Sequence, residues 1–391
     1  MKERKKSIGI VNAYNETAGP FTVLKTFLSH YRNEDVPIVL FIPKGPKALD
    51  FPGNNVRIVY TQTLPIDKDI FSFRIFRYLV GCIAGYFRFL YFYKKYNVGL
   101  VHNNSSNLLI PSLAAQASGV KIVYHIREAW NTRNRLSKIL YHYIAHASAK
   151  IVCISNTALY ANFTEKQRQQ FAGKLTTIAD CIDVESYQRK TIQKDTERVI
   201  VSFVGRIAPI KGLDILVKAF ELLAVQQGIK DVELRIIGDI PKDNAYYRNY
   251  KKLILESVDK CRNVANAKIE MLGFRDDVAE LLLESHVLIL PSRIEEGLGL
   301  VLIEGVVAEN FVITSNFGGQ KEIIEAIGSG FLFENENAQD LASKLALYLS
   351  RRSQLTGAVQ SARANALLLY SPARYQQSLL SLYSEILKNE Q

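Results

Sequence analysis

The chain has 391 residues, 48% of them hydrophobic and 22% charged, a composition typical of globular proteins and a length that favours two domains. No uncharged apolar run approaches the roughly 20 residues that span a bilayer, so we expect no transmembrane helix. The four cysteines are scattered with no CxxC pair. We therefore expect reduced thiols, and neither a zinc site nor a disulfide framework.

Charge divides the chain unevenly. Residues 1–190 hold 26 Lys and Arg against 12 Asp and Glu, a net +14, and the remainder holds 23 against 26, a net −3, which together give +11. The first residues place basic side chains directly before a strand-like run, so we expect no secretory signal. The split suggests that the first half meets an anionic surface or partner.

The first half alternates strand-like and helix-like segments. Strands are predicted at residues 7–13, 36–42, 56–60, 98–102, 120–125, 150–154 and 175–179. Helical patterns lie between several of them, notably at 19–31, 70–96, 107–118 and 132–147. This alternation predicts a parallel sheet with helices on both faces. The polar stretch at 183–198 is typical of a linker.

A second α/β run follows. Strands are predicted at residues 199–204, 232–237, 268–272, 286–290, 311–314 and 331–333, and closing helices at 339–349, 352–368 and 372–388. We therefore predict an α/β fold of two doubly wound, Rossmann-like domains, 1–188 and 189–371, facing an interdomain cleft, with segment 372–391 packed back on the first domain. Such a cleft suits two substrates brought together by domain closure.

Two glutamates eight residues apart, Glu296 and Glu304, are the most informative pair in the sequence. The first lies in the loop after the strand predicted at 286–290, and the second lies in a helix predicted at 299–309. Ligands bind at this edge of an open α/β sheet. Eight residues of helix span about 12 Å, and the glycines between the pair favour close approach of a ligand. For neighbouring Glu295 the simpler interpretation is a carboxylate that interacts favourably with the positive end of the helix dipole.

A second candidate element is the loop after the first strand of the second domain. It contains Gly205 and Arg206, then Lys211 directly before Gly212 and a helix. An arginine fork, a lysine and a helix N-terminus suit a pyrophosphate, although Arg and Lys in a loop are more often simply solvated. The turn at 316–320 is a further candidate for approach to an anion. The sequence has neither a GxGxxG nor a GxxxxGK[ST] motif, so a nucleotide would be held by Arg, Lys, backbone amides and a carboxylate.

Four segments form a recognisable set: 205–212 (GRIAPIKG), 236–240 (IIGDI), 291–305 (PSRIEEGLGLVLIEG) and 317–324 (FGGQKEII). In their order and spacing they resemble the retaining GT-B glycosyltransferases of the family 4 type, known as glycosyl transferases group 1. The resemblance covers the second domain from residue 199 to about residue 330, while the first domain matches only in layout. It implies the GT-B fold and transfer of a sugar from a nucleotide diphosphate without a metal or cofactor, because an Arg/Lys pair neutralises the leaving group.

The resemblance also implies roles for single residues. Arg206 and Lys211 would hold the donor diphosphate, Glu304 would bind the ribose hydroxyls, and Glu296 would hold a hydroxyl of the transferred sugar. His125 ends a predicted strand, as does the family histidine that touches the donor sugar, although a lone histidine is more often a satisfied core or capping residue. The catalytic set is then His125, Arg206, Lys211 and Glu296. The remaining donor-binding candidates are glycines and backbone amides at Gly19, Gly205, Gly238, Gly297, Leu298, Gly299 and Leu300.

Two positions depart from the family pattern. The first loop has Ala18 beside Gly19 where the family commonly has two glycines, and Leu298 stands at a commonly aromatic position. The first change removes a glycine from the loop expected to contact the donor phosphate or the acceptor. Asp67 and Asp69 form a DxD triplet, but its place between a turn and a helix favours a helix cap, and we expect no metal site.

Residues 70–96 contain eleven Phe and Tyr and five Arg and Lys but no acid, and the next acid after Asp69 is Glu128. Interleaved aromatic and cationic side chains are typical of a helix at a membrane interface with anionic headgroups. One alternative is a core-facing helix with buried aromatic side chains, and a third, weaker interpretation is a surface for single-stranded nucleic acid. The membrane or acceptor candidates are Arg74, Arg77, Arg88, Lys94 and Lys95.

These features together predict a retaining glycosyltransferase. It would move a hexose or N-acetylhexosamine from a nucleotide diphosphate sugar, expected to be UDP-linked, to a lipid-linked or growing glycan in the biosynthesis of a bacterial surface polysaccharide such as lipopolysaccharide, capsule or exopolysaccharide. The expected location is the cytoplasm, at the inner face of the plasma membrane, with no nucleic-acid partner. Two alternatives stay open: a sugar-nucleotide epimerase of GT-B architecture, and a non-catalytic, glycosyltransferase-like scaffold that binds membranes.

Overall fold

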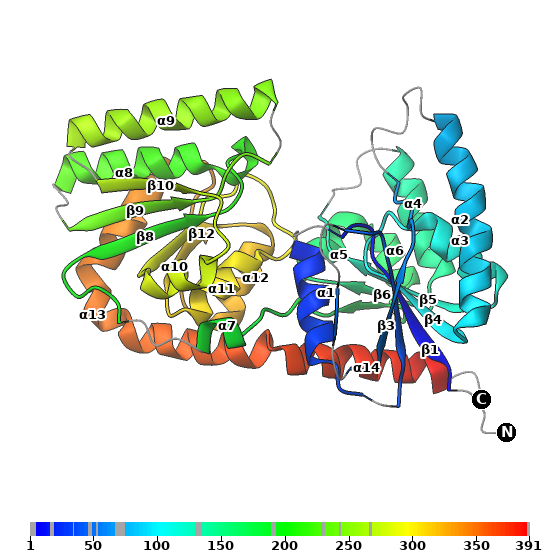
Figure 1. Ribbon diagram of the computed structural model, residues 1–391. Coiled ribbons are helices and arrows are strands. Elements are labelled where there is room, and N and C mark those ends of the chain that lie inside the picture. The colour runs from blue at the N-terminus through cyan, green and yellow to red at the C-terminus, as the bar shows by residue number, and fades with distance from the viewer. Residues whose placement is uncertain are drawn as a thin grey trace. The chain divides into compact units, whose positions relative to one another are not determined.

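The computed structural model describes residues 5–15, 19–33, 35–45, 49–51, 54–66, 75–129, 135–188, 193–227, 231–241, 244–265 and 268–388. The chain divides into two compact units, whose elements are labelled in Figure 1. The first unit comprises Met1–Cys181 and Pro372–Gln391, and the second comprises Ile182–Ser371.

The division after residue 181 comes earlier than the predicted division after residue 188. Residues 182–188 belong to the second unit because α7 (Glu185–Gln188) contacts α10 (Val278–Glu284) and Tyr187 is buried there. The backbone N–H of Ile182 also donates to the carbonyl of Tyr370 at 3.1 Å. The stretch predicted as a linker therefore begins with a packed helix.

The first unit is built on a seven-stranded parallel sheet with the order β3-β2-β1-β4-β5-β6-β7. All seven strands predicted in this half are confirmed, with small differences at their ends. Both β1 and β2 are buried along their whole length, as expected for apolar strands of a sheet covered on both faces. The strands are β1 (Ser7–Val11), β2 (Ile38–Ile42), β3 (Val56–Tyr60), β4 (Val98–Asn103), β5 (Lys121–Ile126), β6 (Lys150–Cys153) and β7 (Leu175–Thr177).

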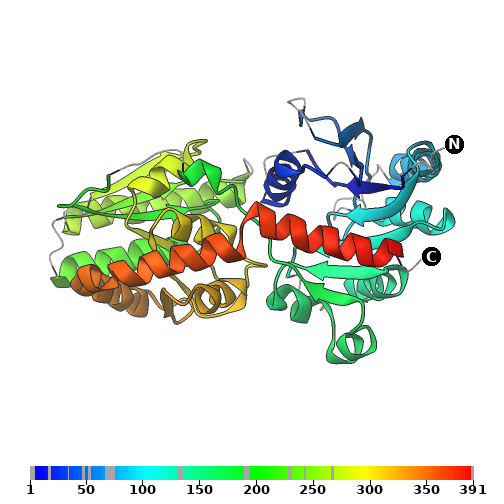
Figure 2. The same ribbon diagram turned by 90° about the horizontal axis from the view of Figure 1, so that it is seen from below.

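Helices cover both faces of this sheet. On one face lie α2 (Ile75–Lys95), α3 (Leu109–Ala117) and α4 (Arg135–Ala147), and on the other α1 (Gly19–His30) packs beside α14 (Pro372–Lys388), as Figures 1 and 2 show. Helices α5 (Asn156–Asn162) and α6 (Glu165–Gln170) follow β6 in the chain. None of the described helices is long and apolar enough to cross a membrane.

The second unit has a six-stranded parallel sheet with the order β10-β9-β8-β11-β12-β13. All six predicted strands are confirmed. Its central strands are buried apolar runs, again the pattern of a sheet with helices on both faces. The strands are β8 (Val199–Val204), β9 (Val232–Ile237), β10 (Lys268–Gly273), β11 (Val287–Leu290), β12 (Phe311–Ser315) and β13 (Phe331–Phe333).

One helix prediction in this unit is wrong. The segments 339–349 and 352–368 form one continuous helix, α13 (Ala338–Leu369), because neither Pro nor Gly interrupts the chain between them. The helix ends just before Ser371–Pro372, where the proline disfavours helical backbone in the preceding residue. The other helices are α8 (Leu213–Gln227), α9 (Ala245–Ala265), α11 (Leu300–Val307) and α12 (Gly318–Ile327), and the 3-10 turn η2 covers Pro209–Lys211.

Each sheet reverses its winding direction at one crevice. The reversal lies between β1 and β4 in the first sheet and between β8 and β11 in the second. In doubly wound sheets, ligands bind outside the carboxyl ends of the strands at this point. The loops that leave β8 and β11 contain most of the residues predicted to bind the donor.

Candidate active site

Glycine contacts hold the loop after β8 against the end of β11. Gly212 has φ 64°, and a Cβ atom placed on it would lie 1.9 Å from the carbonyl oxygen of Pro291, so only glycine fits. The backbone N–H of Arg293 donates to the carbonyl of Ile210 at 2.9 Å. The two predicted donor-binding loops are therefore directly joined.

A bidentate ion pair strengthens this junction. Arg293 donates from Nη1 and Nη2 to the two carboxylate oxygens of Asp214 at 2.8 and 2.5 Å, and Nη1 also donates to the carbonyl of Pro209. Tyr250 donates its hydroxyl to Asp214 at 2.6 Å. The paired guanidinium and the tyrosine hydroxyl outweigh burial and keep the pKa of Asp214 below its usual value.

Lys211 and Glu296, both predicted as catalytic, lie in contact at this junction. Lys211 Nζ donates to Glu296 Oε1 at 2.6 Å, and each side chain is 16% exposed. Ser292 Oγ donates to the same carboxylate oxygen at 2.5 Å. The carboxylate of Glu296 is thus oriented from both sides and still accessible at the edge of the sheet.

The turn at the start of α12 supports the backbone of Glu296. Gln320 is fully buried; its Oε1 accepts from the N–H of Glu296 at 3.0 Å, and its Nε2 donates to the carbonyl of Ile294 at 3.3 Å. A Cβ atom on Gly319 would lie 2.6 Å from the carbonyl oxygen of Gly297. The structure shows this turn supporting the Glu296 loop, and its predicted approach to an anion stays a prediction. Sequence reasoning missed Gln320 and Ser292, since no motif signalled that their side chains turn towards this loop.

Arg206 is exposed. It directly follows Gly205, which takes part in a second close contact between backbone segments. A Cβ atom on Gly238, which has φ 139°, would lie 1.9 Å from the carbonyl oxygen of Gly205, so the predicted pair Gly205 and Gly238 meet. No hydrogen bond or ion pair joins Arg206 to any residue that the structure describes. Its guanidinium is therefore available to an anion, in the same loop as Lys211.

Glu304 lies in the second turn of α11, which begins at Leu300 after Gly299 in the left-handed conformation, φ 91°. Burial raises the pKa of Glu304 to about 7. Within the described ranges, no hydrogen bond or ion pair reaches its carboxylate. A half-buried acceptor without a partner suits hydroxyl donors from a ligand. Leu298, in the preceding loop, is 5% exposed, so its side chain packs inside the unit and the predicted contact of its backbone with the donor stays a prediction.

His125 lies near the end of β5, as the sequence predicted, but it is buried. Its side chain is 0% exposed, and its Nδ1 lies 3.3 Å from Nε2 of His102. Burial, helped by the charge of Arg127, holds the pKa of His125 well below its usual value, so the ring is neutral. This burial fits the alternative of a core histidine, and the predicted contact with a donor sugar stays a prediction.

Arg127 joins the ends of β4 and β5 to α14. It forms an ion pair with Asp180 and donates from Nη2 to Asn104 Oδ1 at 2.9 Å and to the hydroxyl of Tyr375 at 3.1 Å. A second tie links Nδ1 of His102 to the hydroxyl of Tyr383 at 2.5 Å. Both tyrosines lie on α14, so this buried cluster fastens the last helix to the first unit.

Glu128 is the accessible carboxylate at the same edge. It accepts from Ser105 Oγ at 3.1 Å and from Ser106 Oγ at 3.3 Å. Beside it, Asn104 Nδ2 donates to Asn12 Oδ1 at 2.7 Å across the β1–β4 crevice. The sequence pointed to Glu128 only as a neighbour of His125. Gly19 is exposed as the first residue of α1, whereas Ala18, Asp67 and Asp69 lie outside the described residues.

The predicted membrane or acceptor residues lie on one helix. Arg77, Arg88, Lys94 and Lys95 are exposed on α2, and Arg74 lies outside the described residues. In the part of the chain that the structure describes, no group of three or more His, Cys, Asp or Glu side chains is arranged to hold a metal ion.

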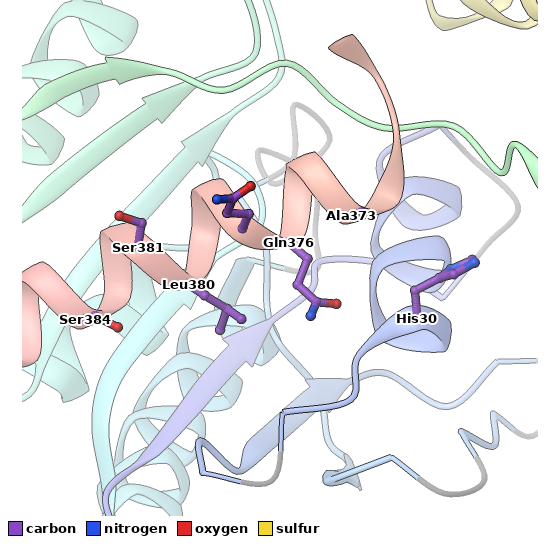
Figure 3. A pocket seen from close by; sticks show the side chains of 7 residues that line it. His30, Ala373, Gln376, Leu380, Ser381 and Ser384 are labelled. Carbon is purple, nitrogen blue, oxygen red and sulfur yellow. The ribbon is translucent and has the colours of Figure 1, made fainter. Parts of the chain in front are cut away.

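The first unit also has a hollow of about 600 Å³ between α1 and α14 (Figure 3). None of the predicted site residues borders it, and its polar groups are amides, hydroxyls and one imidazole. It therefore adds nothing to the donor site. The lining residues are His30, Ala373, Gln376, Gln377, Leu380, Ser381 and Ser384.

Comparison with known proteins defines the class. Residues 184–365, nearly the whole second unit, match the family model of the glycosyl transferases group 1. The chain is similar to a glycosyltransferase from Rickettsia africae, with a TM-score of 0.78 at 20% identity over 99% of this chain and 100% of that one. It is also similar to Anabaena Alr3699/HepE in complex with UDP, with a TM-score of 0.75 at 16% identity over 97% and 100%. The fold is therefore the GT-B fold.

Curated relatives agree with this class. The chain is 33% identical to an uncharacterized glycosyltransferase, MJ1178 of Methanocaldococcus jannaschii, over 37% of this chain and 36% of that protein. It is 23% identical to an Escherichia coli UDP-Gal:α-D-GlcNAc-diphosphoundecaprenol α-1,3-galactosyltransferase over 77% of each. The protein is thus a glycosyltransferase. Its second unit belongs to the glycosyl transferases group 1 family.

Proposed function

We propose that this glycosyltransferase moves a hexosyl or N-acetylhexosaminyl group from a UDP-sugar, with retention of configuration, to a lipid-linked saccharide of a bacterial surface polysaccharide. The proposal rests chiefly on the contact between Lys211 and Glu296 and on the exposed Arg206 of the same loop, which pairs with none of the residues that the structure describes. The UDP bound in the Anabaena structure supports the nucleotide. The acceptor is supported by the E. coli relative and by a Campylobacter jejuni relative named as an N,N'-diacetylbacillosaminyl-diphospho-undecaprenol α-1,3-N-acetylgalactosaminyltransferase.

In the proposed reaction, an acceptor hydroxyl attacks the anomeric carbon from the face that the nucleotide leaves. The bond from that carbon to the diphosphate oxygen breaks, a bond to the acceptor oxygen forms, and the hydroxyl proton passes to a phosphate oxygen of the leaving nucleotide. Arg206 and Lys211 stabilise the charge that develops on the diphosphate, so the proposed reaction requires neither a metal ion nor a cofactor. Glu296 accepts a hydrogen bond from a hydroxyl of the transferred sugar.

Glu304 has the properties of a ribose-binding carboxylate. Its pKa is raised to about 7 by burial, and hydrogen bonds from two ribose hydroxyls stabilise the charged form and lower that pKa. Donor binding below about pH 7 is therefore accompanied by release of a proton. Titration calorimetry of UDP in buffers of different ionisation enthalpy measures this release directly.

We also propose that the protein works in the cytoplasm at the inner face of the plasma membrane. A lipid-linked acceptor lies in that membrane, and the exposed cations of α2 suit its anionic headgroups. These cations are Arg77, Arg88, Lys94 and Lys95.

A transfer assay tests the proposed reaction. The full chain is incubated with each of a panel of UDP- and GDP-sugars and a polyprenyl-diphosphate monosaccharide, and the linkage of the product is determined by NMR. We expect an α-linked disaccharide from an α-linked UDP-sugar. An inverted linkage, transfer from GDP-sugars alone, or an epimerised sugar nucleotide in place of a disaccharide would overturn the proposal.

A further inference from the structure

The outer face of α2 carries a continuous apolar stripe. The spacing of its members, mostly three or four residues, places them on one side of the helix. Each is more than half exposed, and Phe76, Ile83 and Phe87 reach 76%, 62% and 63%. The complete stripe is Phe76, Leu79, Val80, Ile83, Phe87 and Tyr91.

The opposite face of α2 holds the helix firmly to the sheet. Phe89 and Tyr93 are buried, with ring centroids 5.7 and 6.0 Å from that of Phe41 in β2. Tyr93 also donates its hydroxyl to the carbonyl of Pro111 in α3 at 3.0 Å. Because this inner face already packs the core, the outer stripe is surplus to the folding of the unit.

The stripe continues across the neighbouring helices. In α4, Leu136 and Ile139 are 69% and 66% exposed, and between the two helices Leu113 of α3 is exposed as well. Tyr143 of α4 donates its hydroxyl to Gln116 of α3 at 2.9 Å, and α2, α3 and α4 lie on the same side of the sheet (Figure 1). We call the six stripe residues together with Leu113, Leu136 and Ile139 the α2–α4 face. Exposed apolar side chains gathered on three helices of one face are typical of an interaction site.

The charged residues within α2, α3 and α4 are all cations. Arg77, Arg88 and Lys95, spaced by eleven and seven residues, form an exposed column beside the stripe on α2. Arg135 and Lys138 are exposed beside the apolar pair on α4. From residue 70 to residue 127 the sequence contains no Asp or Glu. An apolar face on helices whose charged residues are all cations is complementary to a bilayer that contains anionic lipid.

We propose that the α2–α4 face inserts its apolar side chains into the interfacial region of an anionic bilayer. Its biological role rests on the proposed transfer to a lipid-linked acceptor, but the binding itself is a property of the face. Insertion differs from attachment through the arginines and lysines alone. Raising the salt from about 0.1 M to about 1 M shortens the screening length from about 10 Å to about 3 Å, which releases a protein held only by charge but leaves inserted side chains in place.

Flotation of the full chain with vesicles of phosphatidylcholine, with and without phosphatidylglycerol, tests the proposal. We expect binding to the anionic vesicles that persists in high salt. The double substitution Ile83→Asp and Phe87→Asp should lower the partition coefficient at least tenfold. Leu253→Asp is the matched control, because Leu253 is 59% exposed on α9 of the second unit, and it should bind as the unsubstituted chain does. Unchanged binding of the double variant, or complete release of the unsubstituted chain by salt, overturns the proposal.

A tryptophan at position 87 reports insertion without a charged residue. Phe87→Trp should show a blue-shifted emission and quenching by brominated lipid that Leu253→Trp does not show. The absence of quenching in Phe87→Trp contradicts insertion even if the aspartate variant fails to fold. If light scattering shows a dimer that the double variant abolishes, and no vesicle binding occurs, the face joins two copies of the chain and the proposal is wrong.

Activity separates this proposal from the proposed function. With a water-soluble acceptor, the double variant should transfer sugar within about twofold of the unsubstituted chain, whereas transfer to a vesicle-bound acceptor should fall in proportion to binding. If the unsubstituted chain transfers sugar to neither acceptor, the proposed function fails while the vesicle result stands.

Discussion

The two units use the same edge of the same kind of sheet for different purposes. At the β8–β11 edge the polar side chains stay accessible: Arg206 is exposed, and Lys211 and Glu296 are each 16% exposed. At the β4–β5 edge, Arg127 and Asp180 are 4% and 3% exposed and fasten α14. The architecture thus supplies the position of a site, while the accessibility of its side chains decides whether the position can hold a ligand.

Loss of Lys211 from the accessible β8–β11 edge should have the largest effect on turnover. Lys211→Ala removes a cation expected on the leaving diphosphate, and the loss of one such stabilising group typically lowers kcat by about 10²- to 10³-fold. The fold should persist, because the carboxylate of Glu296 still accepts a hydrogen bond from Ser292 and is still partly exposed to solvent. Steady-state kinetics with the best UDP-sugar, together with thermal unfolding, measure the two effects.

The matched control for this prediction is Lys218→Ala. Lys218 is 51% exposed on α8 and pairs with Glu221, so its removal takes away a surface cation of the same unit. We expect turnover within about twofold of the unsubstituted protein, since exposed pairs of this kind contribute little. Near-normal turnover of Lys211→Ala would show that the donor diphosphate is bound elsewhere.

Glu304→Gln should weaken donor binding and raise stability at the same time. Because burial raises the pKa of Glu304 to about 7, the folded state holds the proton more tightly than the unfolded chain does. The protonated side chain favours the folded state below the usual pKa of Glu. This contribution to the free energy of unfolding is lost as the pH rises through 7. A neutral amide avoids this loss, so we expect a gain of about 1–3 kcal/mol in the free energy of unfolding near pH 8 and little change near pH 5.

Affinity for UDP should move in the opposite direction. The amide offers one acceptor oxygen in place of a carboxylate, so we expect about a 10- to 100-fold loss, consistent with about 1.5–3 kcal/mol for a hydrogen bond to a charged group. Urea unfolding at the two pH values and calorimetry with UDP measure both effects. Equal stability changes at both pH values would mean that Glu304 is charged and solvated in the folded protein.

The donor half of the site is predictable from the sequence because its signals are local. Gly205, Arg206 and Lys211 lie within one loop, and Glu296 and Glu304 lie on either side of one helix start. Each segment follows a strand that apolar composition alone identifies. The supporting groups are not predictable in this way, because Gln320 reaches the Glu296 loop from the next strand–helix connection, and only the folded register brings them together.

The first unit shows where sequence reasoning fails. The position of His125 near the end of β5 was predicted correctly, but its burial depends on Tyr375, which lies 250 residues further along the chain. A strand-end pattern carries no information on what covers it. The two-helix prediction for α13 failed for a local reason, because only Ser350 and Arg351 separate the two predicted segments and neither residue ends a helix.

Gln320→Leu tests the support of Glu296 and should have a moderate effect. It removes the acceptor for the N–H of Glu296 and the donor to the carbonyl of Ile294. Two backbone groups each lose a hydrogen bond, while the volume of the side chain stays nearly the same. We expect kcat to fall about tenfold, since a small displacement of a positioning group affects the transition state most, with KM for the donor changed less. Gln377→Leu on α14, where the glutamine is exposed, should leave both constants unchanged. A change in KM alone would assign Gln320 to donor binding.

His125→Asn should have the smallest effect on turnover. It tests most directly whether the buried edge of the first unit serves stability, in contrast to the accessible edge of the second. Burial lowers the pKa of His125 and brings that of His102 to about 3, so below about pH 6.5 the unfolded chain gains protons that the folded chain does not. Stability is therefore present above that pH and falls as the pH drops, by about 1.4 kcal/mol per pH unit for each histidine. The variant should flatten this slope by about half while turnover per folded molecule stays within about fivefold. A 100-fold loss of kcat with an unchanged pH slope would instead place His125 at the reacting sugar.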